Sequence, residues 1–191
     1  MNCSVLHWPP RDEARSYPGP GCNREYENLG GITWSEVEET LGYESRELER
    51  HGADQAIVEE CEDDDSVMEA TEYLKGLDLG VASSVLALSA AQCVTFSSCN
   101  GGALGDFHHE RHPLVSFFPK RKWIPVLLEC ARKSGTGLEN QDGGALQLYA
   151  DDLRKMVVFA KELLARKNEF SEPRRSKSTS RRSSRQRQQL H

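Results

Sequence analysis

The pattern of hydrophobic and polar residues changes near residue 79. Before that point, apolar residues are scattered among acids, and capping boxes such as Thr33-Trp34-Ser35-Glu36 mark helix starts. Gly42 is expected to end the first helix. The pattern predicts three short helices, over 33–41, 45–51 and 66–75.

After residue 79 the pattern is stronger. The run 79–91 has no charge and many small residues, which is typical of a helix buried on all sides. Runs of β-forming residues predict strands, and apolar residues at a 3.6-residue spacing predict further helices. In chain order we expect a helix over 79–91, strands over 93–97 and 114–118, a helix over 123–134, strands over 137–140 and 145–149, and a last helix capped by Asp151 or Asp152.

This order, α-β-β-α-β-β-α, predicts an α+β fold. A strand-helix-strand unit favours parallel pairing, with a right-handed crossover. The turn Asp142-Gly143-Gly144 favours an antiparallel hairpin instead. A mixed four-stranded sheet with packed helices satisfies both, and the helical N-terminal part would form a cap on it.

We expect one domain, 32–168, between two irregular ends. Residues 1–31 are rich in proline and glycine. Residues 169–191 form a disordered basic tail, rich in Ser and Arg, with too few apolar residues to fold alone. Within the domain, 32–78 would be the acidic helical cap and 79–168 the sheet with its helices.

Charge is distributed unevenly along the chain. The whole chain has 24 Lys and Arg against 30 Asp and Glu, a net charge of −6. Residues 36–72 hold fifteen acids and two basic residues (−13), and residues 171–191 hold seven basic residues and one acid (+6). Without that tail, 17 basic and 29 acidic residues leave −12, which repels nucleic acid phosphates. Nucleic acid is disfavoured except through the tail or a local basic patch such as Lys120-Arg121-Lys122, whereas the acidic face of 36–72 suits a basic protein partner.

No signal for export or membrane insertion is expected from this chain. Its first twenty residues carry prolines and charges where a secretory signal needs an apolar core. No apolar run approaches the ~18 residues that a membrane span requires. The six cysteines have irregular spacing and form no CxxC pair, so we expect reduced thiols in the cytoplasm, with Cys93 and Cys130 buried.

Residues whose side chains could react or bind a ligand cluster between 97 and 112, in an expected loop that follows a strand. This stretch holds one cysteine, three histidines and two acids. The candidate catalytic residues are Cys99, His108 and His109. The candidate ligand-binding residues are Ser97, Ser98, Asn100, Gly101, Gly102 and Glu110.

Three chemistries stay open for this loop. Cys99 and an imidazole from His108 or His109 could form a thiolate–imidazolium pair for nucleophilic catalysis. The turn at 97–102 could hold a small polar or phosphate-bearing ligand through its hydroxyls, amide and backbone N–H groups. A metal bound by Cys99 and the histidines is less favoured, because the spacing matches no strong pattern and adjacent histidines on an extended chain point to opposite faces. No metal or cofactor is therefore assigned.

The segment Ser97-Ser98-Cys99-Asn100-Gly101-Gly102 resembles the Ser-Ser-Cys-Ser-Gly-Arg signature of the tRNA wybutosine-synthesis methyltransferase family. The resemblance covers about residues 93–150 and implies S-adenosylmethionine and a tRNA guanosine derivative. Asn100 and Gly102 depart from the signature, and Gly102 replaces an arginine suited to contact phosphate. The segment also resembles uncharacterised bacterial proteins in which His-His-Glu follows Cys-Asn-Gly-Gly.

The residues thus leave several functions open and do not decide whether the protein is an enzyme. The first is a small-ligand or catalytic site formed by the 97–112 loop. The second is an acidic docking or inhibitor-like protein without catalysis. The third, which the family resemblance implies, is S-adenosylmethionine-dependent RNA modification.

Overall fold

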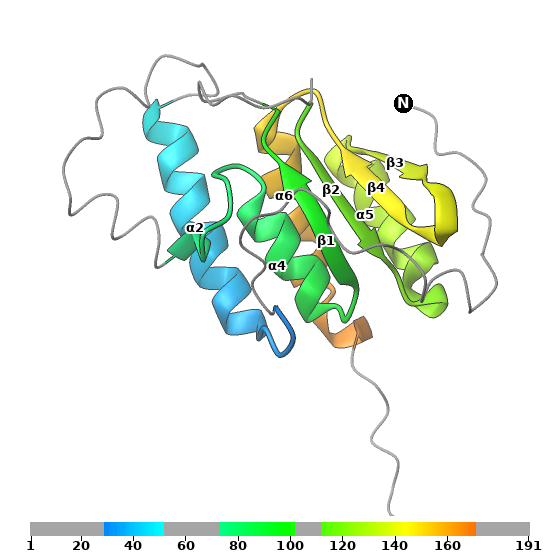
Figure 1. The fold of residues 1–191 in the computed structure, drawn as a ribbon. Coiled ribbons are helices and arrows are strands. Elements are labelled where there is room, and N and C mark those ends of the chain that lie inside the picture. The colour runs from blue at the N-terminus through cyan, green and yellow to red at the C-terminus, as the bar shows by residue number, and fades with distance from the viewer. Residues whose placement is uncertain (1–28, 52–72, 102–111, 171–191) are drawn as a thin grey trace, which may run out of the picture.

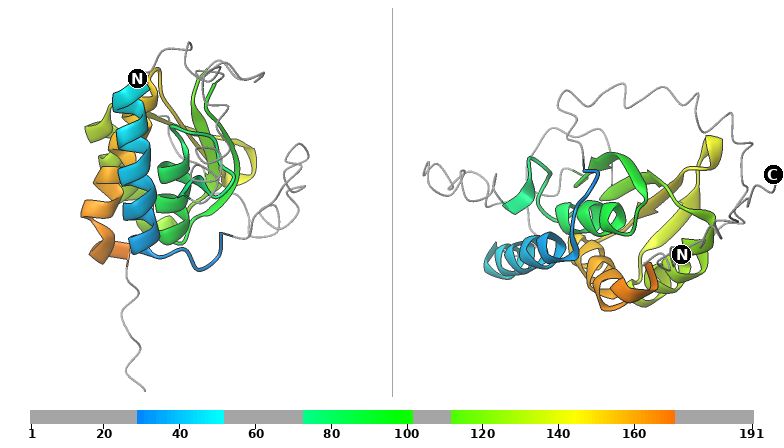
Figure 2. Two further views of the ribbon diagram at one scale, coloured as in Figure 1. Left: turned by 90° about the vertical axis from the view of Figure 1, so that its left-hand side faces the viewer. Right: turned by 90° about the horizontal axis from the view of Figure 1, so that it is seen from below.

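The computed structural model describes residues 29–51, 73–101 and 112–170 (Figure 1). They form one sheet with helices on one side of it (Figure 2). The elements are α2 (Trp34–His51), α4 (Ala82–Ala90), β1 (Val94–Cys99), β2 (Leu114–Phe118), α5 (Ile124–Ser134), β3 (Gly137–Asn140), β4 (Leu146–Tyr149) and α6 (Leu153–Ala165). Short 3-10 turns lie at Arg121–Trp123, Asp142–Gly144 and Lys167–Phe170.

The α+β class, the four strands and the order of elements after residue 79 are confirmed. The expected mixture of parallel and antiparallel pairs is wrong, because the strands lie in the order β1-β2-β4-β3 and all three pairs are antiparallel. β2 and β3, the strands on either side of α5, do run in the same direction. The crossover leaves a gap between them, and β4 fills it, as in a split βαβ unit.

The capping box that begins α2 is confirmed. The Thr33 N–H donates to Glu36 Oε2 at 2.8 Å, and the Glu36 N–H donates to Thr33 Oγ1 at 3.3 Å. α2 is, however, one helix of 18 residues rather than two short ones. Gly42 does not end it, because buried apolar residues on both sides hold the helix against α4 and α6, and this packing outweighs the ~1 kcal/mol that an internal glycine costs. Most of the third expected helix, 66–75, lies outside the described residues.

The core lies between the helices and one face of the sheet. α4 is the buried helix that the uncharged run predicted, with every residue from Ala82 to Leu88 buried. Its small side chains allow the close approach of α2, α6 and β1. The apolar stripe of α6 is confirmed as well: its buried residues are Leu153, Met156, Val157, Phe159, Ala160 and Leu163.

The predicted ends of α5 and α6 are also confirmed. Pro125 lies in the first turn of α5, and Gly135 ends the helix in the left-handed conformation, with φ of 70°. Of the two acids proposed to cap α6, Asp152 does so by accepting a hydrogen bond from the Arg154 N–H at 2.8 Å. The turn between β3 and β4 is where the Asp-Gly-Gly sequence placed it.

The folded body extends to Phe170, two residues beyond the expected boundary at 168. Phe170 is 2% exposed. Its ring centroid lies 5.8 Å from that of Trp34 and 5.2 Å from that of Trp123. These contacts join the end of the described chain to the start of α2 and to the turn before α5. The remaining residues assigned to the two irregular ends, 1–28 and 171–191, lie outside the described parts.

Candidate functional site

Ser97 belongs to strand β1, as predicted, and the strand continues through Ser98 and Cys99, which were expected in the loop. Their backbone pairs with β2, where Ser97 lies opposite Ser116 and Cys99 opposite Leu114. The strand continues because hydrogen bonding to β2 supplies its stability, whatever the polarity of its side chains. The candidate residues therefore start on a rigid element.

Ser97 and Cys99 lie on the face of the sheet that is turned away from the helices. Cys99 and Leu114 are each 7% exposed, yet neither is a member of the core between sheet and helices. The residues of β2 that do belong to that core are Val115 and Phe117, which alternate with Leu114 and Ser116 along the strand. We call the opposite side the outer face, formed by Ser97, Cys99, Leu114, Ser116, Phe118, Gln147 and Tyr149.

A polar row crosses the outer face. Gln141 Nε2 donates to Gln147 Oε1 at 3.1 Å, and Gln147 Nε2 donates to Ser116 Oγ at 3.4 Å. Ser97, which is exposed, continues the row because it lies directly opposite Ser116. The sequence interpretation did not single out Ser116 and Gln147, which lie inside the predicted strands 114–118 and 145–149. The alternation of side chains along those strands was the available signal.

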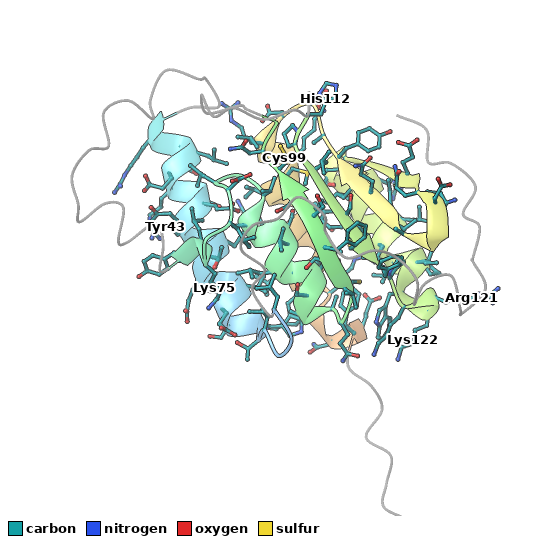
Figure 3. The ribbon with its side chains drawn as sticks, viewed as in Figure 1. Tyr43, Lys75, Cys99, His112, Arg121 and Lys122 are labelled. Carbon is teal, nitrogen blue, oxygen red and sulfur yellow. The ribbon has the colours of Figure 1, made fainter. Side chains whose placement is uncertain are left out.

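At the end of the β1–β2 hairpin the backbone turns sharply. Gly101 has φ of +75°, and a Cβ there would lie 2.7 Å from the His112 carbonyl carbon, so only glycine fits. The Gly101 N–H donates to Cys99 Sγ at 3.2 Å. This turn brings His112 to the same end of the hairpin as Cys99 (Figure 3).

Asp78, which the sequence interpretation did not single out, supports this end from outside the hairpin. Its Oδ2 accepts a hydrogen bond from the Asn100 N–H at 3.3 Å, and its carbonyl oxygen accepts from Val81 and Ala82 at the start of α4. Asn100 itself is 1% exposed, so its side chain lies in the interior. Asp78 thereby couples the end of β1 to α4.

Asp151 adds a charge near the same end. The Lys155 ammonium lies 2.5 Å from Asp151 Oδ1 and holds the pKa of that carboxyl below its ordinary value, with a lesser contribution in the same direction from His112. The neighbouring Ala150 N–H donates to the Pro113 carbonyl at 3.1 Å. The hairpin end is thus tied to the start of α6.

The other candidate residues, Gly102, His108, His109 and Glu110, lie outside the described residues. Their approach to Cys99 remains a prediction. Within the described ranges, no three His, Cys, Asp or Glu side chains gather as metal ligands would.

Cys93, Cys99 and Cys130 are free thiols in buried surroundings. Burial raises the pKa of Cys93 to about 12 and that of Cys130 to about 11, so both stay protonated near neutral pH. This confirms their expected burial in the core. Cys99 differs because it stands on the outer face, at the hairpin end, where its sulfur accepts the Gly101 N–H.

Two acids of the expected docking face have internal roles. Glu44 is fully buried and accepts hydrogen bonds from the N–H groups of Gly80, Ala82 and Ser83, at 2.8, 2.9 and 3.1 Å. Glu36 belongs to the capping box and lies 3.1 Å from the Lys75 ammonium. Exposed acids on α2 are Glu38, Glu39 and Glu49, and residues 52–72 lie outside the described parts.

Comparison with known proteins gives no family: no family model matches the chain, and no curated protein or solved structure shows significant similarity to it. The resemblance to the wybutosine-synthesis methyltransferases therefore stays a prediction. In the described part of the chain, no helix combines the length and apolar composition needed to cross a membrane.

Proposed function

We propose that the outer face beside the β1–β2 hairpin end binds a small polar ligand, with Cys99 as the ligand contact or nucleophile. The observation that supports this most is the polar row from Gln141 through Gln147 and Ser116 to Ser97, next to Cys99. Amide and hydroxyl groups on one rigid surface offer both donors and acceptors to a ligand.

Under this proposal a histidine from the 102–111 segment, His108 or His109, acts as acid or base on the bound molecule. The Gly101 N–H already points at the sulfur, where it would stabilise a developing negative charge. Gly102 and Glu110 would assist binding, and Asp78 acts as a positioning residue for Asn100. Ser98 is left out of this site because it lies opposite Val115, on the face turned toward the helices. A reducing, cytoplasmic setting is part of the proposal, because the role of Cys99 needs a free thiol.

Ligand binding is tested by screening small hydroxylated, amide-bearing and nucleoside compounds by NMR against the full chain. We expect amide shifts to concentrate at 97–101, Ser116 and Gln147, and to disappear in Gln147→Leu. Gln92→Leu is the matched control, because Gln92 pairs with Lys120 at the other end of the hairpin. Shifts that survive in Gln147→Leu, or that vanish in both variants, would contradict the proposal.

The role of Cys99 is tested separately by alkylation with iodoacetamide, followed by mass spectrometry of the modified cysteines. Cys99 should react well before Cys93 and Cys130, whose raised pKa values keep them as thiols. Equal, slow modification of all three would refute the role of Cys99 as a nucleophile, and the proposal would be reduced to ligand binding.

A second candidate is docking to a basic protein partner. Glu38, Glu39 and Glu49 support it because they are exposed along α2. Such binding should weaken as salt rises, and it should be lost when these three residues are replaced by glutamine. Binding that is unaffected by both the salt and the glutamine substitutions would refute this candidate.

A further inference from the structure

A cavity lies where α5 begins and α6 ends. Its volume is about 320 Å³. Figure 3 shows Lys122 near this end of the molecule, with Cys99 and His112 at the opposite end. The lining residues are Lys122, Trp123, Pro125, Val126, Arg166 and Glu169.

One buried hydrogen-bond donor at this cavity has no acceptor, and a second donor group nearby has only long contacts. Trp123 is 8% exposed, and its indole Nε1–H makes no hydrogen bond within the described structure. The Arg166 side chain is 23% exposed, and its nearest carboxylate oxygens, on Glu129 and Glu169, lie 3.7 and 3.9 Å away, beyond hydrogen-bond range. Buried donors are normally satisfied, so the unpaired Trp123 N–H at this cavity calls for an acceptor.

The carboxylate nearest to Arg166 is already engaged elsewhere. Arg132 donates to both oxygens of Glu129, at 2.8 and 3.1 Å, which is a bidentate pair. Both oxygens of Glu129 are therefore already hydrogen-bonded to Arg132. Arg166 makes only long ion-pair contacts with Glu129 and Glu169, so its guanidinium can still donate hydrogen bonds to a ligand at the cavity.

The cavity also carries positive charge in a chain that is otherwise acidic. The Lys122 ammonium lies 4.2 Å from the centroid of the Trp123 ring, a cation–π contact that holds it at the cavity. Lys122 belongs to the basic run 120–122, and the N-terminal end of α5 contributes a further partial positive charge. Glu169 is the one acid in the lining.

We propose that this cavity binds a small organic anion, a carboxylate or a phosphate ester, through Arg166 and Lys122. The Trp123 N–H is its inner contact, and the apolar part of the ligand lies against Pro125 and Val126. Arg166 offers a planar fork of donors that matches either head group. This site is independent of the one proposed on the outer face.

The test is a titration of the full chain with phenyl phosphate, benzoate and inorganic phosphate at constant ionic strength. Binding is followed by the NMR signal of the Trp123 indole N–H, which is assigned by its absence in Trp123→Phe. We expect a saturable shift with at least one organic anion. Tighter binding of phenyl phosphate than of benzoate assigns a phosphate ester, and the reverse assigns a carboxylate. Weaker binding of inorganic phosphate than of phenyl phosphate shows that the apolar wall contributes.

Arg166→Met should weaken the binding about tenfold or more, because a charge-assisted hydrogen bond is lost. Arg154→Met is the matched control: it removes the same charge near the other end of α6, where the side chain is 59% exposed, and should leave binding unchanged. If Arg166→Met does not fold, Arg166→Lys and Trp123→Phe replace it, followed at the Val126 and Leu127 amides, and both should bind more weakly. No saturable shift with any anion, or equal losses in Arg154→Met and Arg166→Met, would overturn the proposal.

Discussion

The two faces of the sheet differ although they belong to the same strands. The inner face presents Val115, Phe117, Leu146 and Leu148 to the helices, all 2% exposed or less. The outer face, one residue away along each strand, carries Ser116 and Gln147 in a hydrogen-bonded row. The first face packs against the helices and is mostly apolar, with Thr95 and Ser98 as its polar members on β1, whereas no described helix covers the second. Residues that stabilise the core therefore alternate with residues of the proposed ligand-binding face along the same strands.

The largest expected effect tests this separation with two adjacent phenylalanines. Phe117→Ala on the inner face should lower the free energy of unfolding by about 3–5 kcal/mol, because it opens a cavity in a closed core. Phe118→Ala on the outer face, where the ring is half-buried against Phe96, should cost clearly less. Urea denaturation of the two variants measures the difference. Equal losses would mean that the outer face is packed as tightly as the inner one.

Glu44 is a fully buried acid on the helix side of the sheet. Glu44→Ala should lower the free energy of unfolding by about 2–4 kcal/mol, because the buried Gly80 and Ser83 N–H groups lose their acceptor and Ala82 loses one of two. Glu38→Ala, an exposed acid on the same helix, should change it by about 0.5 kcal/mol or less. Chemical denaturation at neutral pH compares the two. A small loss for Glu44→Ala would show that α4 does not depend on this carboxylate.

Gly101 tests the hairpin end that supports the candidate site. Gly101→Ala should cost about 2–3 kcal/mol, because the new Cβ meets the His112–Pro113 backbone in addition to the strain of a positive φ. Gly76→Ala is the control: its φ is also positive, at +71°, but nothing lies within 4 Å, so only about 1–2 kcal/mol is expected. Thermal unfolding of both variants gives the difference. If the two glycines behave alike, the turn is free to relax and does not fix His112 beside Cys99.

The smallest effects concern pH, where two glutamates on α2 act in opposite directions. Burial raises the pKa of Glu44 above its ordinary 4.5, so its contribution to stability is fullest below pH 4.5 and declines as pH rises through the folded-state pKa. The Thr33 N–H and hydroxyl and Lys75 lower the pKa of Glu36 to about 2, so its contribution is present above pH 4.5 and is lost as pH falls toward 2.

Stability curves of Glu44→Gln and Glu36→Gln between pH 2 and 8 check these signs. Glu44→Gln should remove part of the decline on the alkaline side, and Glu36→Gln should remove part of the loss on the acid side. Either substitution altering the opposite side of the curve would contradict the assignment of that carboxyl.

Elements whose own residues decide their structure were predicted well. The uncharged run of α4, the stripe of α6 and the apolar residues of β2 each match the structure closely. Failures came where distant partners decide. Gly42 is a local stop signal, but the packing of α2 overrides it. The position of β4 between β2 and β3 depends on how separate segments meet, which local composition does not encode.

The candidate site shows the same limit. Cys99 and Ser97 were singled out by residue type, and the structure places them on one face of β1. Ser116, Gln147 and Asp78 join them only through strand register and tertiary contact. Such a set is scattered along the chain, so no motif search at fixed spacing would gather it.

The start of α4 has a consequence for how the chain folds. This helix has no capping side chain of its own at Val81. Its first N–H groups donate to Glu44, contributed by another helix, in addition to the Asp78 carbonyl. A peptide of α4 alone would lack that acceptor, and α2 alone would carry an unpaired carboxylate in its apolar stripe. Each helix therefore reaches its stable form only in the presence of the other. The two helices should form and melt as one cooperative unit, and their slowest-exchanging amides should share a single opening free energy.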